Sequence, residues 1–229
     1  MSIAGNLLDL IYPPVCHSCG KRLARGERWL CARCLAELPR TYYERRDSNP
    51  MTERFAGRFP LLRAASLCHY SNGSPIASIL HDFKYRGCES LAEFMGEVMG
   101  RELAGSGFFD GADYLVPVPM HFFKRAKRGY NQVEALCRGL SAATGIPVRQ
   151  VVKAATRHRS QTVLTGEQRR RNMEGVFRYN DEYQHKGRNL VLVDDVCTTG
   201  STLLNMALTI IKAEPGATLS VLTLASTDN

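Results

Sequence analysis

Val191-Leu192-Val193-Asp194-Asp195-Val196-Cys197-Thr198-Thr199-Gly200-Ser201-Thr202 is the segment that decides the fold. Three apolar β-formers precede two adjacent acids, and a small, hydroxylated turn leads into a helical pattern. A buried strand therefore delivers Asp194 and Asp195 to its C-terminal end, before a helix N-terminus whose N–H groups and dipole stabilise a phosphate. Gly200 lacks a Cβ, so the backbone there can take a positive φ or approach a ligand closely. Two neighbouring acids can bind two neighbouring hydroxyls, so the segment predicts a site for a sugar phosphate with a free cis-diol.

The same segment resembles the phosphoribosyl pyrophosphate (PRPP) binding motif of type I phosphoribosyltransferases. The resemblance implies that Asp194 and Asp195 hold the ribose hydroxyls. It also implies that the 5-phosphate is held by Thr198, Thr199, Gly200, Ser201 and Thr202. Many members have glycine in place of Ser201, which still supplies an N–H group. The alternative is an ordinary strand-to-helix turn with a capping Thr or Ser. That alternative leaves two acids at the end of a buried strand without a partner, which costs free energy.

Length and charge limit the classes of protein. The 229 residues fit one sizeable domain and a small module, and the net charge of +8 favours anionic partners such as PRPP or nucleic acid. No apolar run reaches the roughly 18 residues of a membrane span, so none is expected. Residues 1–15 lack a basic start and contain Asp9, so we expect no signal peptide and a cytoplasmic location.

Four cysteines form the pattern C-x2-C-x11-C-x2-C at Cys16, Cys19, Cys31 and Cys34. Two such pairs place four thiolates around one tetrahedral centre, which predicts a closed structural zinc (Zn2+) site. His17 is an alternate ligand. The other interpretation is a pair of disulfides, which the expected cytoplasmic location disfavours. The module is too small to bury a core, so metal binding should supply its folding free energy.

From residue 63 onward the apolar residues alternate between strand-like runs and helical spacing. Strands are expected at 63–70, 113–118, 148–152, 176–179, 190–193 and 218–224, and helices at 76–83, 91–103, 133–143 and 201–213. This alternation predicts an α/β fold with a parallel, Rossmann-like sheet that binds ligands at its strand C-termini. The expected division is a zinc-ribbon module at 1–40, a polar linker at 41–62 and a phosphoribosyltransferase-like domain at 63–229.

Three further segments suit a PRPP site. The loop 117–132 carries Lys124, Arg125 and Arg128, whose charges predict a pyrophosphate loop; the alternative is a solvated basic loop. The long polar stretch 157–177, with Gln161 and Arg169, is typical of a lid, or else of a surface loop. In this fold the segment before the sheet core often covers the acceptor pocket, where 84–87 lies. A basic cluster also simply suits a helix C-terminus.

Four blocks in this order are similar to the ComF family of competence-associated, phosphoribosyltransferase-like proteins. They are Cys16–Cys34, Arg128–Gln132, the block from Gln161 to Phe177, and Asp194–Thr202. The resemblance covers nearly the whole chain. It implies a type I phosphoribosyltransferase fold and a cytosolic bacterial protein that acts in DNA uptake or use during natural transformation. Many proteins with this fold bind PRPP to regulate rather than to catalyse.

As an enzyme, the protein would transfer ribose 5-phosphate from PRPP, with Mg2+, to a nitrogen acceptor. Asp194 and Asp195 would orient the sugar, while Lys124, Arg125 and Arg128 would stabilise the departing pyrophosphate. The candidate catalytic residues are Asp194, Asp195 and Arg128. Gln161 and Arg169 would close over the ligand. The acceptor, and whether catalysis occurs at all, stay open.

Two alternatives are binding functions. In the first, PRPP is a sensor ligand and the basic N-terminal part binds single-stranded DNA. Its stacking and basic residues would be Trp29, Tyr42, Tyr43, Arg28, Arg40, Arg45 and Arg46. In the second, the zinc ribbon docks onto proteins of the competence machinery. A homodimer is a further expectation, because this fold often dimerises.

Overall fold

The computed structural model describes residues 13–85, 87–120, 125–126, 128–155, 176–180 and 189–227. Its centre is a four-stranded parallel sheet in the order β1-β6-β5-β2. The strands are β1 (Leu61–His69), β2 (Tyr114–Pro117), β5 (Asn189–Cys197) and β6 (Thr218–Ser226). A separate antiparallel pair consists of β3 (Val152–Ala154) and β4 (Phe177–Tyr179). The expected α/β fold with a parallel sheet is confirmed.

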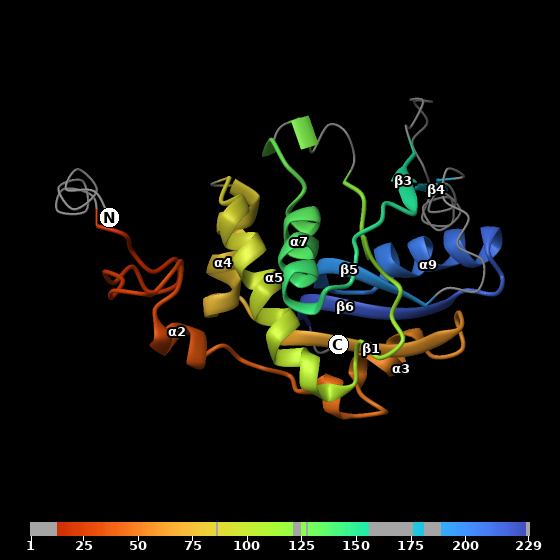
Figure 1. Ribbon diagram of the computed structural model, residues 1–229, viewed down its shortest axis with the longest axis horizontal. Helices are drawn as coiled ribbons and strands as arrows, with labels where there is room; N and C mark the ends of the chain where they lie inside the picture. Colours follow the sequence, from red (N-terminus) through yellow and green to blue (C-terminus); the bar gives the residue numbers. More distant parts are fainter. Residues whose placement is uncertain are drawn as a thin grey trace.

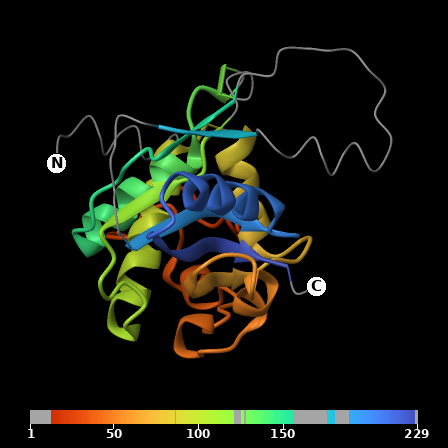
Figure 2. The ribbon, with the colours of Figure 1, turned by 90° about the vertical axis from the view of Figure 1, so that its right-hand side faces the viewer.

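Helices flank the sheet (Figures 1 and 2). The long ones are α4 (Pro75–Tyr85), α5 (Glu89–Leu103), α7 (Gln132–Thr144) and α9 (Ser201–Ala213). Two glycines let α5 and α7 pack closely, since a Cβ on Gly139 would lie 1.9 Å from the carbonyl oxygen of Glu93, and one on Gly96 would lie 2.1 Å from that of Leu136. In Figure 1, α4, α5 and α7 stand together at one side of the sheet, and the cysteine segment lies beyond them. Among the described helices, none combines the length and the apolar run that a bilayer crossing requires.

The segment expected as a linker is ordered and packs on the sheet. After the short α2 (Ala32–Ala36), it forms the 3-10 turn η1 (Tyr43–Arg45) and the helix α3 (Pro50–Phe55). Asn49 caps α3 in a reciprocal capping box, and proline occupies the first turn, where its missing N–H costs nothing. Met51 and Phe55 are buried in the same core as β1. This segment is therefore part of the body of the protein.

The remaining connections differ in detail from the expected elements. The strand expected at 148–152 is a single bridge between Val148 and Leu115, followed by β3. A short 3-10 turn, η2 (Ala104–Ser106), ends α5. At the edge of β1, the N–H of Thr41 donates to the carbonyl of Leu67 across 3.0 Å. This pairing covers the exposed edge of the sheet with the segment that follows the zinc module.

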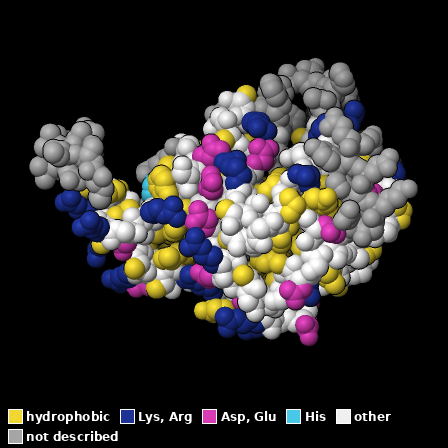
Figure 3. Space-filling model, in the orientation of Figure 1, with side chains coloured by type: hydrophobic (Ala, Val, Ile, Leu, Met, Phe, Trp, Pro, Cys, Tyr) yellow, Lys and Arg dark blue, Asp and Glu magenta, His cyan; other side chains and the backbone are white. Residues whose placement is uncertain are grey.

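The surface in Figure 3 shows basic side chains gathered over the N-terminal part, interleaved with acids from the helices. Two of these basic residues form ion pairs that join the N-terminal part to helix α5. Arg28 pairs with Glu97 at 3.1 Å, and Arg40 pairs with Glu102 at 2.6 Å. The Arg28 side chain is exposed, and a pair of that kind is worth at most ~1 kcal/mol, so it orients the zinc module more than it stabilises it. The Arg40 side chain is largely buried.

Candidate functional site

The acidic pair lies near the C-terminal end of β5, between β2 and β6. Four consecutive apolar residues before it are buried, as the sequence predicts for a central parallel strand. Asp195 is only 7% exposed. Its Oδ2 accepts a hydrogen bond from Gln132 Nε2 across 2.9 Å and lies 3.4 Å from Lys84 Nζ. Its Oδ1 accepts from the backbone N–H of Val196 across 2.8 Å. This buried carboxylate is therefore held by a side-chain amide, a backbone N–H group and a cation.

The two carboxyl groups affect each other. Burial raises the pKa of Asp194 well above its ordinary value, and repulsion from Asp195 raises it further. The N–H of Asp195 donates to Asp194 Oδ1 across 2.9 Å and opposes this rise. The side chain of Asp194 is only half-buried, so solvent moderates the effect. Ligand hydroxyls or a divalent cation would relieve the repulsion. Adjacent carboxylates are the hard oxygen donors that Mg2+ takes, so the residues fit that ion.

The segment Arg128-Gly129-Tyr130-Asn131-Gln132 connects to this pair. Arg128 Nη1 donates to Gln132 Oε1 across 2.7 Å, and Gln132 in turn donates to Asp195. Asn131 caps α7, since its Oδ1 accepts from the N–H of Val133 across 3.0 Å. Sequence reasoning assigned Arg128 to the pyrophosphate, and the structure puts it two hydrogen bonds from the acidic pair.

The rest of the basic loop is only partly described. Arg125 is exposed and pairs with Glu134 at 3.1 Å, so its charge is turned toward α7. Lys124, Gln161 and Arg169 lie outside the described residues. Their expected contacts with the ligand stay predictions.

Lys84 has a position that sequence reasoning did not assign. The sequence predicts that residues 84–87 cover an acceptor pocket, whereas the structure puts the ammonium group of Lys84 against Asp195. Tyr85, the next residue, is 72% exposed and stacks on His81 with ring centroids 4.8 Å apart. The last turn of α4 therefore contributes directly to the acidic site.

The turn after β5 has the form that the sequence predicts. Gly200 has a φ of +75° and is the N-cap of α9, which has no side-chain cap among the described residues. Thr198, Thr199 and Thr202 are exposed, and Thr199 Oγ1 lies 2.8 Å from Ser201 Oγ. Thr199 Oγ1 also accepts from the N–H of Ser201, but across a long 3.4 Å. Because Gly200 itself has no side chain to cap the helix, the start of α9 can bind an anion.

A groove of about 380 Å³ opens beside this turn. Its lining joins the turn to α3 and consists of Glu53, Arg54, Phe55, Arg58, Thr198, Thr199, Gly200, Ser201 and Leu204. Asp194, Asp195 and Thr202 are not part of that lining. The acidic pair therefore begins the segment 194–202, and the groove lies beside the turn that follows in the same segment.

Arg54 and Phe55 are the residues that sequence reasoning missed. Arg54 Nη1 donates to Cys197 Sγ across 3.3 Å, and its Nη2 donates to the carbonyl of Thr227 across 2.8 Å. The ring of Phe55 lies under Gly200, where an added Cβ would come within 2.9 Å of it. The capping signal at Asn49 and Pro50 could have revealed the helix, but nothing local indicates that it supports the phosphate turn.

The four cysteines converge as their spacing predicts. Their Sγ atoms all lie within 4.8 Å of one another, and Cys19 and Cys31 are 3.9 Å apart. Zinc–sulfur bonds of ~2.3 Å in a tetrahedron put the sulfurs ~3.8 Å apart, so the set fits zinc. No disulfide joins them, which excludes the alternative pairing. Burial acts to raise the pKa of Cys16, but backbone N–H groups, among them those of Cys19 and Cys31, outweigh it and lower this pKa to about 6. His17 points elsewhere, with its Nδ1 2.6 Å from Asp82 Oδ2.

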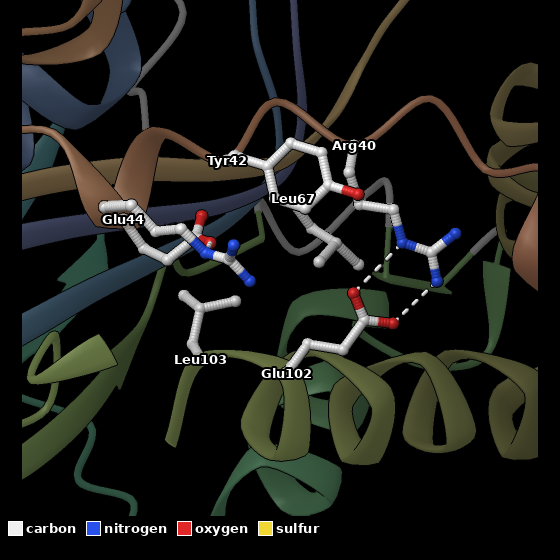
Figure 4. Close-up of a pocket in the computed structure, with 7 residues that line it drawn as sticks. Arg40, Tyr42, Glu44, Leu67, Glu102 and Leu103 are labelled. Atoms are coloured by element: carbon white, nitrogen blue, oxygen red, sulfur yellow. Dashed lines mark hydrogen bonds and ion pairs between the residues drawn. The ribbon is translucent and has the colours of Figure 1, made fainter. Parts of the chain in front are cut away.

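A second pocket of about 270 Å³ lies between the segment after the zinc module and the end of α5 (Figure 4). Two nitrogens of Arg40 donate to the carboxylate of Glu102, at 3.0 and 2.6 Å.

Of the aromatic residues considered for base stacking, Tyr43 is 4% exposed and so is unavailable. Tyr42 is 49% exposed and has the guanidinium of Arg45 5.0 Å from its ring centre. Trp29 packs on His17 with ring centroids 5.5 Å apart.

Comparison with known proteins agrees with this arrangement. Residues 7–45 match the family described as double zinc ribbon domain. The DNA utilization protein YhgH of Escherichia coli O6:H1 is 29% identical over 199 residues, which cover 84% of this chain and 82% of that protein. The competence protein ComFC of Bacillus subtilis is 25% identical over 213 residues, which cover 92% of this chain and 83% of that protein.

Among solved structures, the glutamine PRPP amidotransferase of Bacillus subtilis is 19% identical and has a TM-score of 0.41. The match covers 59% of this chain and 26% of that one, so it spans about a quarter of the enzyme. The fold is therefore described from the parallel sheet itself. Over most of its length the chain is similar to proteins named for DNA utilization and for competence, and its converging cysteines agree with the double zinc ribbon that its N-terminal part matches.

Proposed function

We propose that the protein binds PRPP at the end of β5 and acts in the uptake or use of DNA during natural transformation. The observation that carries the first part is the adjacent pair Asp194–Asp195, with Lys84 and Gln132 on one carboxylate and an uncapped helix N-terminus directly after it. The second part is supported by the relatives, which are named for DNA utilization and for competence.

Each group has a role in binding. The two carboxylates accept hydrogen bonds from the ribose 2- and 3-hydroxyls, and the N–H groups at the start of α9 bind the 5-phosphate. Arg128 and Lys84 supply positive charge near the pyrophosphate. Asp194 and Asp195 would hold Mg2+, which would supply positive charge near the pyrophosphate. The four cysteines would hold zinc, and because four protein ligands fill a tetrahedral site, that metal would be structural.

The reaction that such a site supports is transfer of ribose 5-phosphate to a nitrogen nucleophile. The acceptor nitrogen forms a bond with C1 while the bond from C1 to the pyrophosphate oxygen breaks. The electron pair leaves with pyrophosphate, and the acceptor loses a proton to solvent. Asp194 and Asp195 favour this step because they stabilise positive charge that develops at C1.

Calorimetry with PRPP and Mg2+ tests the binding proposal. Wild-type protein should bind, and the Asp194→Asn/Asp195→Asn variant should not. Glu37→Gln, on the surface of the zinc module, is the control and should bind as wild type does. A thermally silent wild-type titration would end the proposal. Pyrophosphate release over a panel of nucleobases then separates an enzyme from a PRPP sensor.

Single-stranded DNA binding is a second candidate function. Tyr42, half-exposed and stacked with Arg45, offers a ring on which a base can stack, and the net charge is +8. Affinity for an oligonucleotide should fall steeply with salt and should fall again in Tyr42→Ala. An affinity that stays the same at high salt and in Tyr42→Ala would contradict this candidate function. We also propose a cytoplasmic location, because none of the eight cysteines is in a disulfide.

A further inference from the structure

We propose that the zinc module positions Lys84 at the acidic pair by holding the last turn of α4 through the contact between His17 and Asp82. Asp82 is then a positioning residue for the PRPP site, and the zinc ribbon is part of the machinery that binds PRPP. The proposal rests on the proposed function. It adds a physical connection between two parts of the chain that the family resemblance leaves separate.

Three consecutive residues at the end of α4 are each held by a different part of the protein. Asp82 Oδ2 accepts from His17 Nδ1 of the zinc module across 2.6 Å. The carbonyl of Phe83 accepts from Tyr130 Oη across 2.6 Å. Lys84 Nζ then lies 3.4 Å from Asp195. The zinc module, the loop before α7 and the acidic pair of β5 therefore meet on one helical turn.

Asp82 is an unexpected residue at this place. Its side chain is 6% exposed, and it lies at the C-terminal end of a helix, where the dipole disfavours a negative charge. Burial of a carboxylate without a partner costs free energy as well. The contact with His17 offsets both effects, and His81 Nδ1 lies 3.6 Å from the other oxygen of Asp82. The acid is thus accounted for by docking of the zinc module on α4.

His17 is itself held by the fold of the zinc module. It lies between two of the four cysteines, its N–H donates to the carbonyl of Trp29 across 2.9 Å, and its ring packs on the indole. The orientation of the imidazole therefore depends on the cysteine cluster being assembled. Loss of that assembly releases Asp82, and the turn that carries Lys84 loses one of its three restraints.

The chain offers a matched control for this argument. Arg28, also in the zinc module, pairs with Glu97 in the middle of α5 at 3.1 Å. This contact docks the same module on the same body but does not involve α4. Arg28→Ala therefore weakens docking without releasing Lys84.

The first experiment is a double-mutant cycle read by PRPP calorimetry. Asp82→Asn and Lys84→Met should each weaken PRPP binding about fivefold, which corresponds to ~1 kcal/mol. The Asp82→Asn/Lys84→Met protein should bind no more weakly than Lys84→Met alone, since Asp82 acts through Lys84. Arg28→Ala should bind as wild type does, and zinc content should be unchanged in every variant. Effects of Asp82→Asn and Lys84→Met that simply add would overturn the proposal.

The second experiment needs no ligand. It measures amide hydrogen exchange in the peptide that covers Leu80–Tyr85. Exchange in Asp82→Asn should be faster than in wild type and Arg28→Ala. Unchanged exchange in Asp82→Asn would refute the proposal even if PRPP binds. If wild-type protein binds no PRPP, the proposed function fails, whereas this experiment still decides whether the zinc module holds the turn of Lys84.

Discussion

Gln132 Nε2 donates to Asp195 Oδ2 across 2.9 Å, and this bond joins the start of α7 to the acidic pair of β5. The other end of the same amide accepts from Arg128 across 2.7 Å. A neutral side chain thus relays the position of a guanidinium to a buried carboxylate. Asn131 makes this possible, because it caps α7 and sets where Gln132 begins the helix.

Gln132→Leu should weaken PRPP binding about tenfold. It leaves Asp195 with one donor fewer while burial persists, and an unsatisfied buried partner of this kind costs ~1–3 kcal/mol. Calorimetry and thermal melting measure the two effects. Arg101→Gln, which loses only a surface pair on α5, is the control. Wild-type affinity in Gln132→Leu would show that the relay is not needed.

Asp194→Asn should stabilise the protein at neutral pH while it abolishes PRPP binding. Burial and the charge of Asp195 raise the pKa of Asp194 in the folded state, so the folded protein holds this proton more tightly than the unfolded chain. Below the unfolded-state pKa of ~3.9, the protonated Asp194 contributes its full share to the stability of the fold. This contribution is lost as the pH rises through the raised pKa of the folded state. Asn cannot ionise, so the variant avoids that loss, and its free energy of unfolding at neutral pH should be larger than that of wild type by on the order of 1 kcal/mol.

The same reasoning sets the pH dependence of this gain. Thermal melts of Asp194→Asn and wild type should differ most near neutral pH and converge below pH ~3, where Asp194 is protonated in both states. A variant that melts below wild type at neutral pH would contradict the direction of the shift.

Gly200→Ala should destabilise the fold by more than ~1 kcal/mol and weaken binding of ribose 5-phosphate. The residue has a φ of +75°, and the new methyl group would lie 2.9 Å from the Phe55 ring. Gly57→Ala is a matched control, because Gly57 also has a positive φ, +69°, but nothing within 4 Å of an added Cβ. Equal losses in the two variants would mean that the contact with Phe55 adds nothing.

Arg54→Ala should weaken binding of ribose 5-phosphate about tenfold, since hydrogen bonds from a charged group are worth ~1.5–3 kcal/mol. The change removes the bonds to Cys197 and Thr227 that brace the end of β5 next to the phosphate turn. Arg58→Ala removes an exposed cation from the same groove, so it measures how much the loss of positive charge alone weakens binding. A larger effect in Arg58→Ala than in Arg54→Ala would argue for charge rather than support of the turn.

Zinc removal should unfold the N-terminal module and leave the sheet intact. Trp29 is the one tryptophan of the chain and packs on His17, so its fluorescence reports on this module. A chelator should shift that emission while far-ultraviolet circular dichroism changes little. Cys19→Ser should behave as the chelated protein does, and Lys212→Gln, in the last turn of α9, as wild type does. Elemental analysis that finds no zinc in protein with native emission would remove the site.

The sequence alone determined the features that depend on neighbouring residues. The apolar run before Asp194, the positive φ at Gly200 and the convergence of the four cysteines are each set by local periodicity, by the absence of a side chain or by short spacing. The α/β class follows in the same way, because alternating strand and helix patterns are visible along the chain.

Only the tertiary structure decided which distant segments support the site. Arg54 and Cys197 are 143 residues apart in the chain, and His17 and Asp82 are 65 apart. Nor does any local pattern in α4 announce that Lys84 faces Asp195. Such contacts arise because the fold brings α3 and the end of α4 to the C-terminal end of β5, as the contacts of Arg54 and Lys84 show. The six residues of α3 are too few for a periodicity to show in the sequence. Local chemistry therefore fixes the groups that bind, whereas packing of the whole fold fixes the groups that hold them in place.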